Sequence, residues 1–205
     1  LPAPRCRRCF LPQGTGTGPV PDCEECRRWP PILAAARSAV VLEPPADRLV
    51  HGLKYGGWEE LAGPLGRRMA DVDLPPAGSG AGDVVVPVPT TRGRQRRRGY
   101  NQAAALAVVV SHLLGRPLVR ALARRPGGRT QVSLQPVERG RNVRRAFEVT
   151  EEARSRVRGC RVLLVDDVLT TGATAAAVAR SLEGAGVREV VLLTFARALP
   201  YRTSS

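Results

Sequence analysis

Several residue types are scarce in this chain of 205 residues, and each scarcity argues against a class of protein. Aromatic residues make up only 4% of the chain, so the stacking side chains with which many proteins bind single-stranded nucleic acid are poorly supplied. Lysine occurs once, as Lys54. The two histidines, His51 and His112, have no partners at metal-ligand spacing, so we expect them to be structural or exposed.

Long apolar runs are also missing. The best run, from Ala103 to Val110, is far shorter than the roughly 20 residues that a membrane span needs. The first residues include neither the apolar segment of a secretory signal nor an initiator methionine. We therefore expect a soluble, cytoplasmic protein without a membrane span. An apolar fraction of 43% supports a real core, and the length suits one α/β domain with a small appendage.

The charge balance is strongly basic, with 32 basic residues against 18 acidic ones and a net charge of +14. All the basic residues except Lys54 are arginines, which reflects either a GC-rich genome or anionic partners that the planar guanidinium grips. Five arginines crowd positions 92–98, and residues 116–145 carry nine arginines against one acid, Glu138. This clustering favours a phosphate-bearing partner, either a small ligand or nucleic acid.

Four of the five cysteines form two pairs at the spacing of metal knuckles. Cys6 and Cys9 make the first pair and Cys23 and Cys26 the second, with thirteen residues between the pairs. Two such pairs fill the tetrahedral shell of one zinc ion, whereas two disulfides are the alternative. A four-cysteine site is closed, so we expect a structural zinc and no catalysis at this metal. The fifth, Cys160, precedes an apolar strand and is interpreted as a buried small hydrophobic residue.

The predicted elements alternate between strands and helices along most of the chain. Strands are predicted at 38–42, 83–87, 118–122, 161–165 and 189–196. Helices are predicted from residue 46, over 59–70 and 101–114, and after residue 174. This alternation predicts an α/β fold with a parallel, doubly wound sheet. The polar stretch 124–145 is long for a connection inside a compact domain, and such connections are usually functional or mobile.

The stretch that says most about chemistry runs from Val162 to Thr174. An apolar strand leads into Asp166 and Asp167, and a turn of threonines around Gly172 follows. Free N–H groups and hydroxyls at a helix N-terminus suit a phosphate, although no Gly-Lys-Ser/Thr sequence of a Walker A loop is present. Carboxylates would repel that phosphate but accept hydrogen bonds from vicinal ribose hydroxyls. The turn therefore favours a sugar 5-phosphate with magnesium nearby, and simple helix capping is the alternative.

The order of residues in this stretch resembles the 5-phosphoribosyl-1-pyrophosphate (PRPP) signature of type I phosphoribosyltransferases. The chain as a whole resembles the ComF family of phosphoribosyltransferase-like proteins, and the similarity covers nearly all 205 residues. Besides the knuckles and the Asp-Asp turn, the landmarks are the sequences at 51–55, 86–89, 98–102, 131–134, 139–142 and 146–147. One departure is Gly128, where the family usually has a threonine.

The resemblance implies a specific architecture and site. It implies a type I phosphoribosyltransferase-like open parallel sheet with helices on both faces over 31–205, preceded by a small four-cysteine zinc ribbon over 1–30. Asp166 and Asp167 would hold the ribose 2- and 3-hydroxyls, and the loop with Val88 and Pro89 would approach the pyrophosphate. The 5-phosphate would lie on Thr170, Thr171, Gly172, Ala173 and Thr174.

The segment 124–145 would be the loop that closes over the site in such enzymes. Its arginines Arg129 and Arg139 would stabilise the departing pyrophosphate while the loop excludes water, although either could instead be a solvated surface charge.

The implied activity is that of a phosphoribosyltransferase, an enzyme of the glycosyltransferase class. With magnesium it would transfer the phosphoribosyl group of PRPP to an unknown acceptor and release pyrophosphate, with a link to DNA uptake in natural competence. The alternative is a non-catalytic accessory protein of DNA uptake that keeps the fold and binds single-stranded DNA and competence-machinery proteins. The intact Asp166-Asp167 turn favours ligand binding and the charge of +14 favours nucleic acid, so the two readings are compatible.

Overall fold

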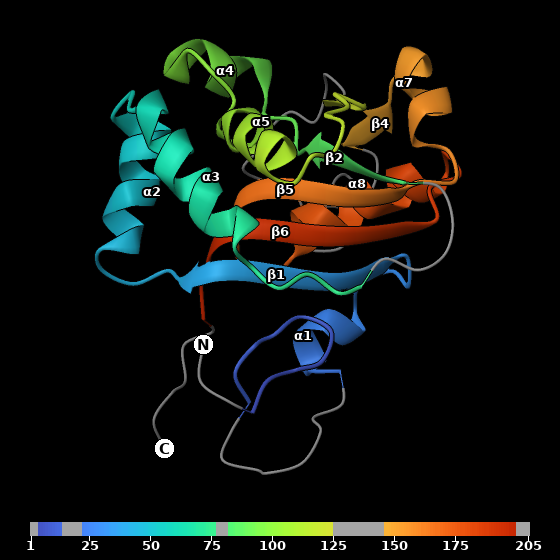
Figure 1. Cartoon of the computed structure of the whole chain (residues 1–205), viewed down its shortest axis with the longest axis horizontal. Helices are drawn as coiled ribbons and strands as arrows, with labels where there is room; N and C mark the ends of the chain where they lie inside the picture. Colours follow the sequence, from blue (N-terminus) through green and yellow to red (C-terminus); the bar gives the residue numbers. More distant parts are fainter. Residues whose placement is uncertain (1–3, 14–21, 77–81, 125–145, 200–205) are drawn as a thin grey trace, which may run out of the picture.

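Four runs rich in valine, leucine and alanine form one parallel sheet (Figure 1). The computed structural model describes residues 4–13, 22–76, 82–124 and 146–199. Its strands β1 (Leu33–Val41), β6 (Glu189–Arg197), β5 (Arg161–Leu169) and β2 (Asp83–Pro87) lie side by side in that order. The predicted parallel α/β fold is confirmed. Near-continuous apolar strands are expected here, because a parallel sheet is covered on both faces.

Helices cover the two faces of the sheet. Helices α2 (Ala46–Tyr55), α3 (Ala62–Ala70) and α5 (Gln102–Leu113), with the short helix η1 (Glu59–Leu61), lie on one face, and α8 (Ala173–Glu183) lies on the other (Figure 1). Strand β5 shows how one strand serves both layers, since successive side chains point to opposite faces. Leu163 and Val165 belong to the core under α2, α3 and α5, whereas Val162 and Leu164 belong to the core under α8.

A small hairpin and a helix follow the main α5 layer. Strands β3 (Leu122–Arg124) and β4 (Phe147–Val149) pair in antiparallel fashion, and helix α7 (Glu151–Val157) leads from them into β5. The Ser181 hydroxyl of α8 donates a hydrogen bond of 3.0 Å to the Phe147 carbonyl, which ties the hairpin to the sheet layers. The two strands flank the segment 125–145, which lies outside the described residues.

Several boundaries differ from the sequence predictions. The strand predicted at 38–42 begins at Leu33, and the strand predicted at 118–122 is reduced to a bridge between Leu118 and Val85 before β3. Strand β5 runs four residues further than predicted and carries both Asp166 and Asp167. Helix α4 (Arg92–Arg98) was not predicted, because a run of arginines has no apolar period to reveal it. Among the described residues, no helix is both long and apolar enough to cross a membrane.

The cysteine-containing segment, with the one-turn helix α1 (Glu24–Arg27), packs beside the edge strand β1 (Figure 1). The Ala36 amide of β1 donates to the Arg8 carbonyl at 2.9 Å, so the first knuckle covers part of the otherwise free sheet edge. Arg197 of β6 is 1% exposed and donates to the Cys9 carbonyl at 2.7 Å. Trp29 is also buried, so the stretch after Cys26 is a packed connection and not a free linker.

Candidate ligand site

A cavity of about 250 Å³ lies at the carboxyl ends of the neighbouring strands β2 and β5. Ligands of open parallel sheets bind at this position, because the loops that follow the strands converge there. Strand β5, the loop after β2, helices α2, α4, α5 and α8, and the hairpin contribute the residues that line it: Lys54, Tyr55, Val88, Pro89, Thr90, Arg94, Arg98, Asn101, Gln102, Ala103, Arg124, Asp166, Asp167 and Thr174. Of the predicted ligand-site residues, Val88, Pro89, Asp166, Asp167 and Thr174 line this cavity.

The two aspartates lie in this cavity, and their carboxylates have different partners. Asp167 forms an ion pair with Lys54, with 3.3 Å between Oδ1 and Nζ, and both side chains are largely buried. Asp166 accepts a hydrogen bond of 2.9 Å from the Asp167 amide. Burial, and then the neighbouring charge of Asp167, raise the pKa of Asp166 to about 7. One carboxylate is thus held by a cation, while the other stands near the midpoint of its titration at neutral pH.

Three arginines join Lys54 around the cavity. Arg94 and Arg98 are one turn apart on α4, and Arg124 is the last residue of β3. Burial, and secondly the positive charge of Arg94, lower the pKa of Arg124. Because Arg94 and Arg124 line the same small cavity, a polyanion placed between them would relieve the repulsion of their charges.

The rim of the cavity carries an exposed aromatic ring. The Arg98 guanidinium lies over the Tyr55 ring, 4.9 Å from its centroid, and donates to the Gln102 side-chain oxygen at 2.8 Å. Tyr55 remains 65% exposed. Tyr55 belongs to the landmark sequence at 51–55, and only the structure places its ring against the arginine cluster. The Tyr100 hydroxyl is engaged elsewhere, since it donates to the Leu53 carbonyl.

The threonine turn between β5 and α8 is only partly in the cavity. Thr174, in the first turn of α8, lines it, whereas Thr170, Thr171 and Ala173 are exposed beside it. Gly172 is the N-cap residue of α8 and has φ +76°, a left-handed conformation that favours glycine. The turn 170–174 therefore forms the start of α8, where the Ala173 amide donates to the Thr171 hydroxyl at 3.4 Å. Arg129 and Arg139 lie outside the described residues.

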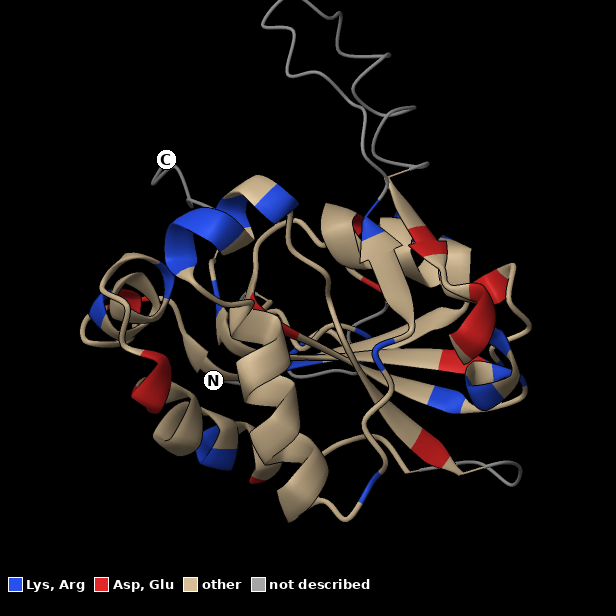
Figure 2. Cartoon of the chain, turned by 90° about the horizontal axis from the view of Figure 1, so that it is seen from above, with Lys and Arg blue, Asp and Glu red and all other residues tan. Residues whose placement is uncertain are grey.

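The arginines of α4 divide between two faces of the helix. Arg94 and Arg98 line the cavity, while Arg92 and Arg96 line a separate shallow hollow with Gln95 and Gly99. Figure 2 shows basic residues along nearly the whole of this short helix at the surface. The arginines at 92–98 form one basic cluster in the sequence, but in the structure they line two separate parts of the surface, the cavity and the shallow hollow.

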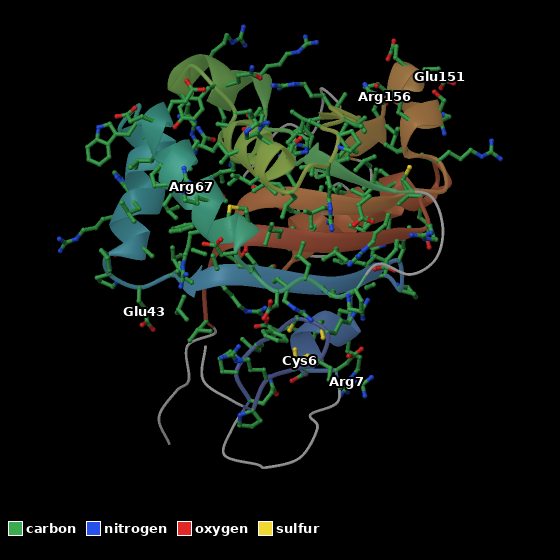
Figure 3. All side chains as sticks on the ribbon, viewed as in Figure 1. Cys6, Arg7, Glu43, Arg67, Glu151 and Arg156 are labelled. Carbon is green, nitrogen blue, oxygen red and sulfur yellow. The ribbon has the colours of Figure 1, made fainter. Side chains whose placement is uncertain are left out.

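The four N-terminal cysteines form a compact cluster away from the cavity. Their sulfur atoms all lie within 4.8 Å of one another, all four residues are buried, and Figure 3 shows the sulfurs gathered beside β1. The Cys6–Cys26 and Cys9–Cys23 sulfurs are 3.6 and 3.3 Å apart, much further than the roughly 2.05 Å of a disulfide bond. Four thiolates at these separations can hold one tetrahedral metal ion.

The contributions of Arg94, Arg98 and Arg124 to the cavity were not foreseen. The clusters that contain them were noticed, but a count of arginines does not show which of them face inward. A helix predicted over 92–98 would have placed Arg94 and Arg98 on the same side. The segment contains no apolar residue, so no helical period indicated a helix there. The structure places Lys54, the one lysine of the chain and part of the landmark at 51–55, in the cavity against Asp167.

Comparisons with known proteins found a family model, sequence relatives and structural neighbours. A phosphoribosyl transferase domain model matches residues 95–203. The DNA utilization protein YhgH of Salmonella typhi is 32% identical over 198 residues, which cover 95% of this chain and 84% of the relative. Competence protein F of Haemophilus influenzae is 36% identical over 117 residues, which cover 57% of this chain and 51% of the relative. An allosteric regulatory enzyme of purine biosynthesis superposes with a TM-score of 0.48 and 23% identity, covering 70% of this chain and 29% of that one.

Proposed function

Since the chain belongs to the ComF family of phosphoribosyltransferase-like proteins, we propose that its cavity binds PRPP and that the protein transfers the phosphoribosyl group. The observation that carries the proposal is the convergence of two carboxylates, Asp166 and Asp167, with four cationic side chains in one cavity at the strand ends. A ligand that fits must present hydroxyl donors to the acids and several phosphate charges to the cations. PRPP has both.

Each group of the ligand has a counterpart in the chain. The ribose 2- and 3-hydroxyls donate to Asp166 and Asp167, and the 5-phosphate lies on the turn 170–174 at the N-terminus of α8. The pyrophosphate lies between the loop at Val88–Pro89 and the arginines Arg94, Arg98 and Arg124. Arg129 and Arg139, in the segment outside the described residues, are proposed to join them.

Transfer breaks the bond between the anomeric carbon and the pyrophosphate oxygen and forms a bond to the acceptor nucleophile. Positive charge grows on the ribose and negative charge on the leaving pyrophosphate as the bond lengthens. Arg94, Arg98 and Arg124 line the cavity in which this negative charge would develop, and cations held in place before the reaction lower its barrier. Magnesium, bound by the ligand's phosphates and by carboxylate oxygens such as those of Asp166 and Asp167, would neutralise part of the same charge.

Calorimetric titration with PRPP, with and without magnesium, tests the proposal. We expect magnesium-dependent binding, and a strong loss of affinity in the double variant Asp166→Asn with Asp167→Asn. Each lost charged acceptor weakens binding by about 1.5–3 kcal/mol, which is roughly a tenfold to hundredfold rise in Kd. Unchanged affinity in the double variant would remove the ribose assignment.

A matched control uses another adjacent pair of acids. Glu151→Gln with Glu152→Gln removes the same two charges from α7, where both side chains are exposed and neither lines the cavity (Figure 3). We expect its affinity for PRPP to equal that of the unchanged protein. Release of pyrophosphate from PRPP, measured across a panel of candidate acceptors, then distinguishes an enzyme from a PRPP-binding protein.

A second function is favoured by the outward face of α4. Arg92, Arg96 and Arg97 are exposed and do not line the cavity, and relatives of this chain are named for DNA utilization and for competence. We propose that this face binds the phosphate backbone of single-stranded DNA. Such binding is electrostatic, weakly selective for sequence and strongly dependent on salt.

The variant Arg92→Ala, Arg96→Ala, Arg97→Ala tests this second function while Arg94 and Arg98 stay in place. We expect weaker binding of single-stranded DNA and a salt slope that is lower by about 2, since each phosphate contact contributes about 0.7. PRPP affinity should be unchanged. Arg67→Ala with Arg68→Ala, on the exposed side of α3 (Figure 3), is the control and should leave both ligands unaffected. Retention of the full slope in the triple variant would place the DNA surface elsewhere.

A further inference from the structure

Trp29 connects the cysteine cluster to the turn that we assign to the 5-phosphate. We propose that Trp29 is a positioning residue for this turn, and that metal in the cysteine cluster sets the affinity of the cavity for its phosphorylated ligand through it. The inference rests on the proposed function, since it takes the turn to be the phosphate site. The cysteine segment then has a role in ligand binding in addition to its structural role.

The contact between Trp29 and the turn is close and specific. The indole N–H donates to the Thr171 carbonyl at 3.2 Å, although the two residues are far apart in the sequence. A Cβ atom added to Gly172 would lie 2.5 Å from the Trp29 ring, and Gly172 has φ +76°. The ring therefore fills the space where any other residue would place its side chain. Trp29 is 6% exposed, so the indole has little freedom to move away.

The other side of Trp29 is fixed by the cysteine cluster. Its backbone amide donates to the Cys26 carbonyl at 3.0 Å, three residues after the last of the four cysteines. The Arg8 guanidinium, from inside the first knuckle, lies 5.9 Å from the Trp29 ring centroid and donates to the Cys26 carbonyl at 2.9 Å and to the Pro30 carbonyl at 2.7 Å. Residues of both knuckles therefore fix the position of Trp29, and Trp29 contacts the turn.

Movement of Trp29 would change the ligand site, because the turn that it contacts also begins helix α8. Gly172 is the N-cap residue of α8, and Thr174 of the same turn lines the cavity beside Asp166 and Asp167. A shift of the Gly172 backbone would move the first N–H groups of α8, which are the donors proposed for the phosphate. Loss of the metal releases Cys26, and with it Trp29, so ligand affinity falls. Coupling between two binding sites is reciprocal, so the ligand must also tighten the metal.

Two substitutions test the role of Trp29 in the full-length protein. Trp29→Phe keeps a ring against Gly172 but removes the indole N–H, and we expect PRPP to bind roughly 2- to 10-fold more weakly. Trp29→Ala also removes the ring, and we expect a larger loss. Metal content, measured by elemental analysis, should remain that of the unchanged protein in both variants, which separates positioning from collapse of the cluster. Trp58→Phe, at the other and exposed tryptophan, is the control and should bind normally.

The reciprocal measurement is the rate at which a colorimetric chelator removes zinc. PRPP with magnesium should slow this release in the unchanged protein, and the slowing should disappear in Trp29→Ala. Normal PRPP affinity in Trp29→Ala, or ligand protection of the metal that survives that substitution, overturns the proposal.

A third readout needs no ligand, so it separates failure of this inference from failure of the proposed function. In Trp58→Phe protein, Trp29 is the only tryptophan, and its emission should change when zinc is removed. Hydrogen exchange at residues 171–176 should quicken on zinc removal in the unchanged protein, and should be equally fast with and without zinc in Trp29→Ala. If PRPP fails to bind but these changes occur, the link between metal and turn stands and the ligand assignment falls. If zinc removal leaves exchange at the turn unchanged, the link itself is absent.

Discussion

Asp166 and Asp167 are neighbours in the chain, yet their surroundings differ. Successive residues of a strand point to opposite faces, and Asp167 lies on the side of α2, where Lys54 reaches it at 3.3 Å. The charge of Lys54 lowers the pKa of Asp166, but burial and the charge of Asp167 have larger effects. The pKa of Asp166 is therefore raised to about 7. A half-buried carboxyl group with a raised pKa beside cations is typical of a ligand or catalytic site.

This raised pKa predicts how stability changes with pH. Between the ordinary aspartate value of 3.8 and about 7, the folded protein binds a proton at Asp166 that the unfolded chain has lost. Stability contributed by this group is therefore highest below pH 4 and falls as the pH rises through 7. Asp166→Asn should remove this dependence and raise the free energy of unfolding at pH 8 by about 1–3 kcal/mol. Urea denaturation of both proteins at pH 5, 6, 7 and 8 measures it, and parallel curves would contradict the assignment.

At the scale of elements, the layer of helices over the sheet depends on one close approach between α3 and α5. A Cβ atom added to Gly66 of α3 would lie 2.7 Å from the Val109 Cβ atom of α5. Glycine is therefore required by packing, although it is a poor helix former. Gln102 and Ala103, at the start of α5, line the cavity, so the position of α5 also affects the site.

Gly66→Ala should lower the free energy of unfolding. A Cβ separation of 2.7 Å puts the cost of overpacking Val109 toward the upper end of about 1–3 kcal/mol, above the roughly 1 kcal/mol gained in helix propensity. Gly63→Ala, in the first turn of the same helix, meets nothing within 4 Å and should be neutral or slightly stabilising. Thermal denaturation of the two variants checks the pair. A Gly66→Ala protein as stable as Gly63→Ala would show that the two helices can separate without cost.

At the scale of the whole molecule, the cysteine cluster is part of the main core. Its four residues belong to the same buried apolar cluster as Leu33 of β1 and the inner face of α8. Arg197 anchors it from β6, with an ion pair of 3.0 Å to Glu25 and a hydrogen bond to the Cys9 carbonyl. Removing both partners from water is costly unless they stay paired, so this anchor depends on the cluster keeping its shape.

The purified protein should carry about one zinc ion per chain, and Cys23→Ser should release it and unfold the N-terminal segment. Elemental analysis and hydrogen exchange over residues 4–31 provide the measurements. Cys160→Ser is the matched control, because Cys160 lies outside the cluster and should leave the zinc content unchanged. Absence of metal together with two oxidised cysteine pairs would overturn the zinc assignment.

The sequence by itself determined the features that depend on neighbouring residues. The apolar runs specified strands β2, β5 and β6, the helical period specified α2, α5 and α8, and the spacing of the cysteines specified one cluster. The motif of Asp166, Asp167 and the following threonines was equally easy to identify, because its carboxyl and hydroxyl groups come from a few consecutive positions. Local patterns are readable because strand and helix periods and ligand spacings are short-range properties of the chain.

Only the tertiary structure decided which distant residues meet. Lys54 of α2 reaches Asp167 of β5 because α2 packs on one face of the sheet, and Arg94 and Arg98 of α4 meet Arg124 of β3 at the same cavity. Trp29 lies on Gly172 because the knuckles fold back against β1 and past the start of α8. Such contacts depend on crossover connections and on the packing of layers, and a one-dimensional pattern does not encode them. The residues could be read from the sequence, but the site had to be assembled by the fold.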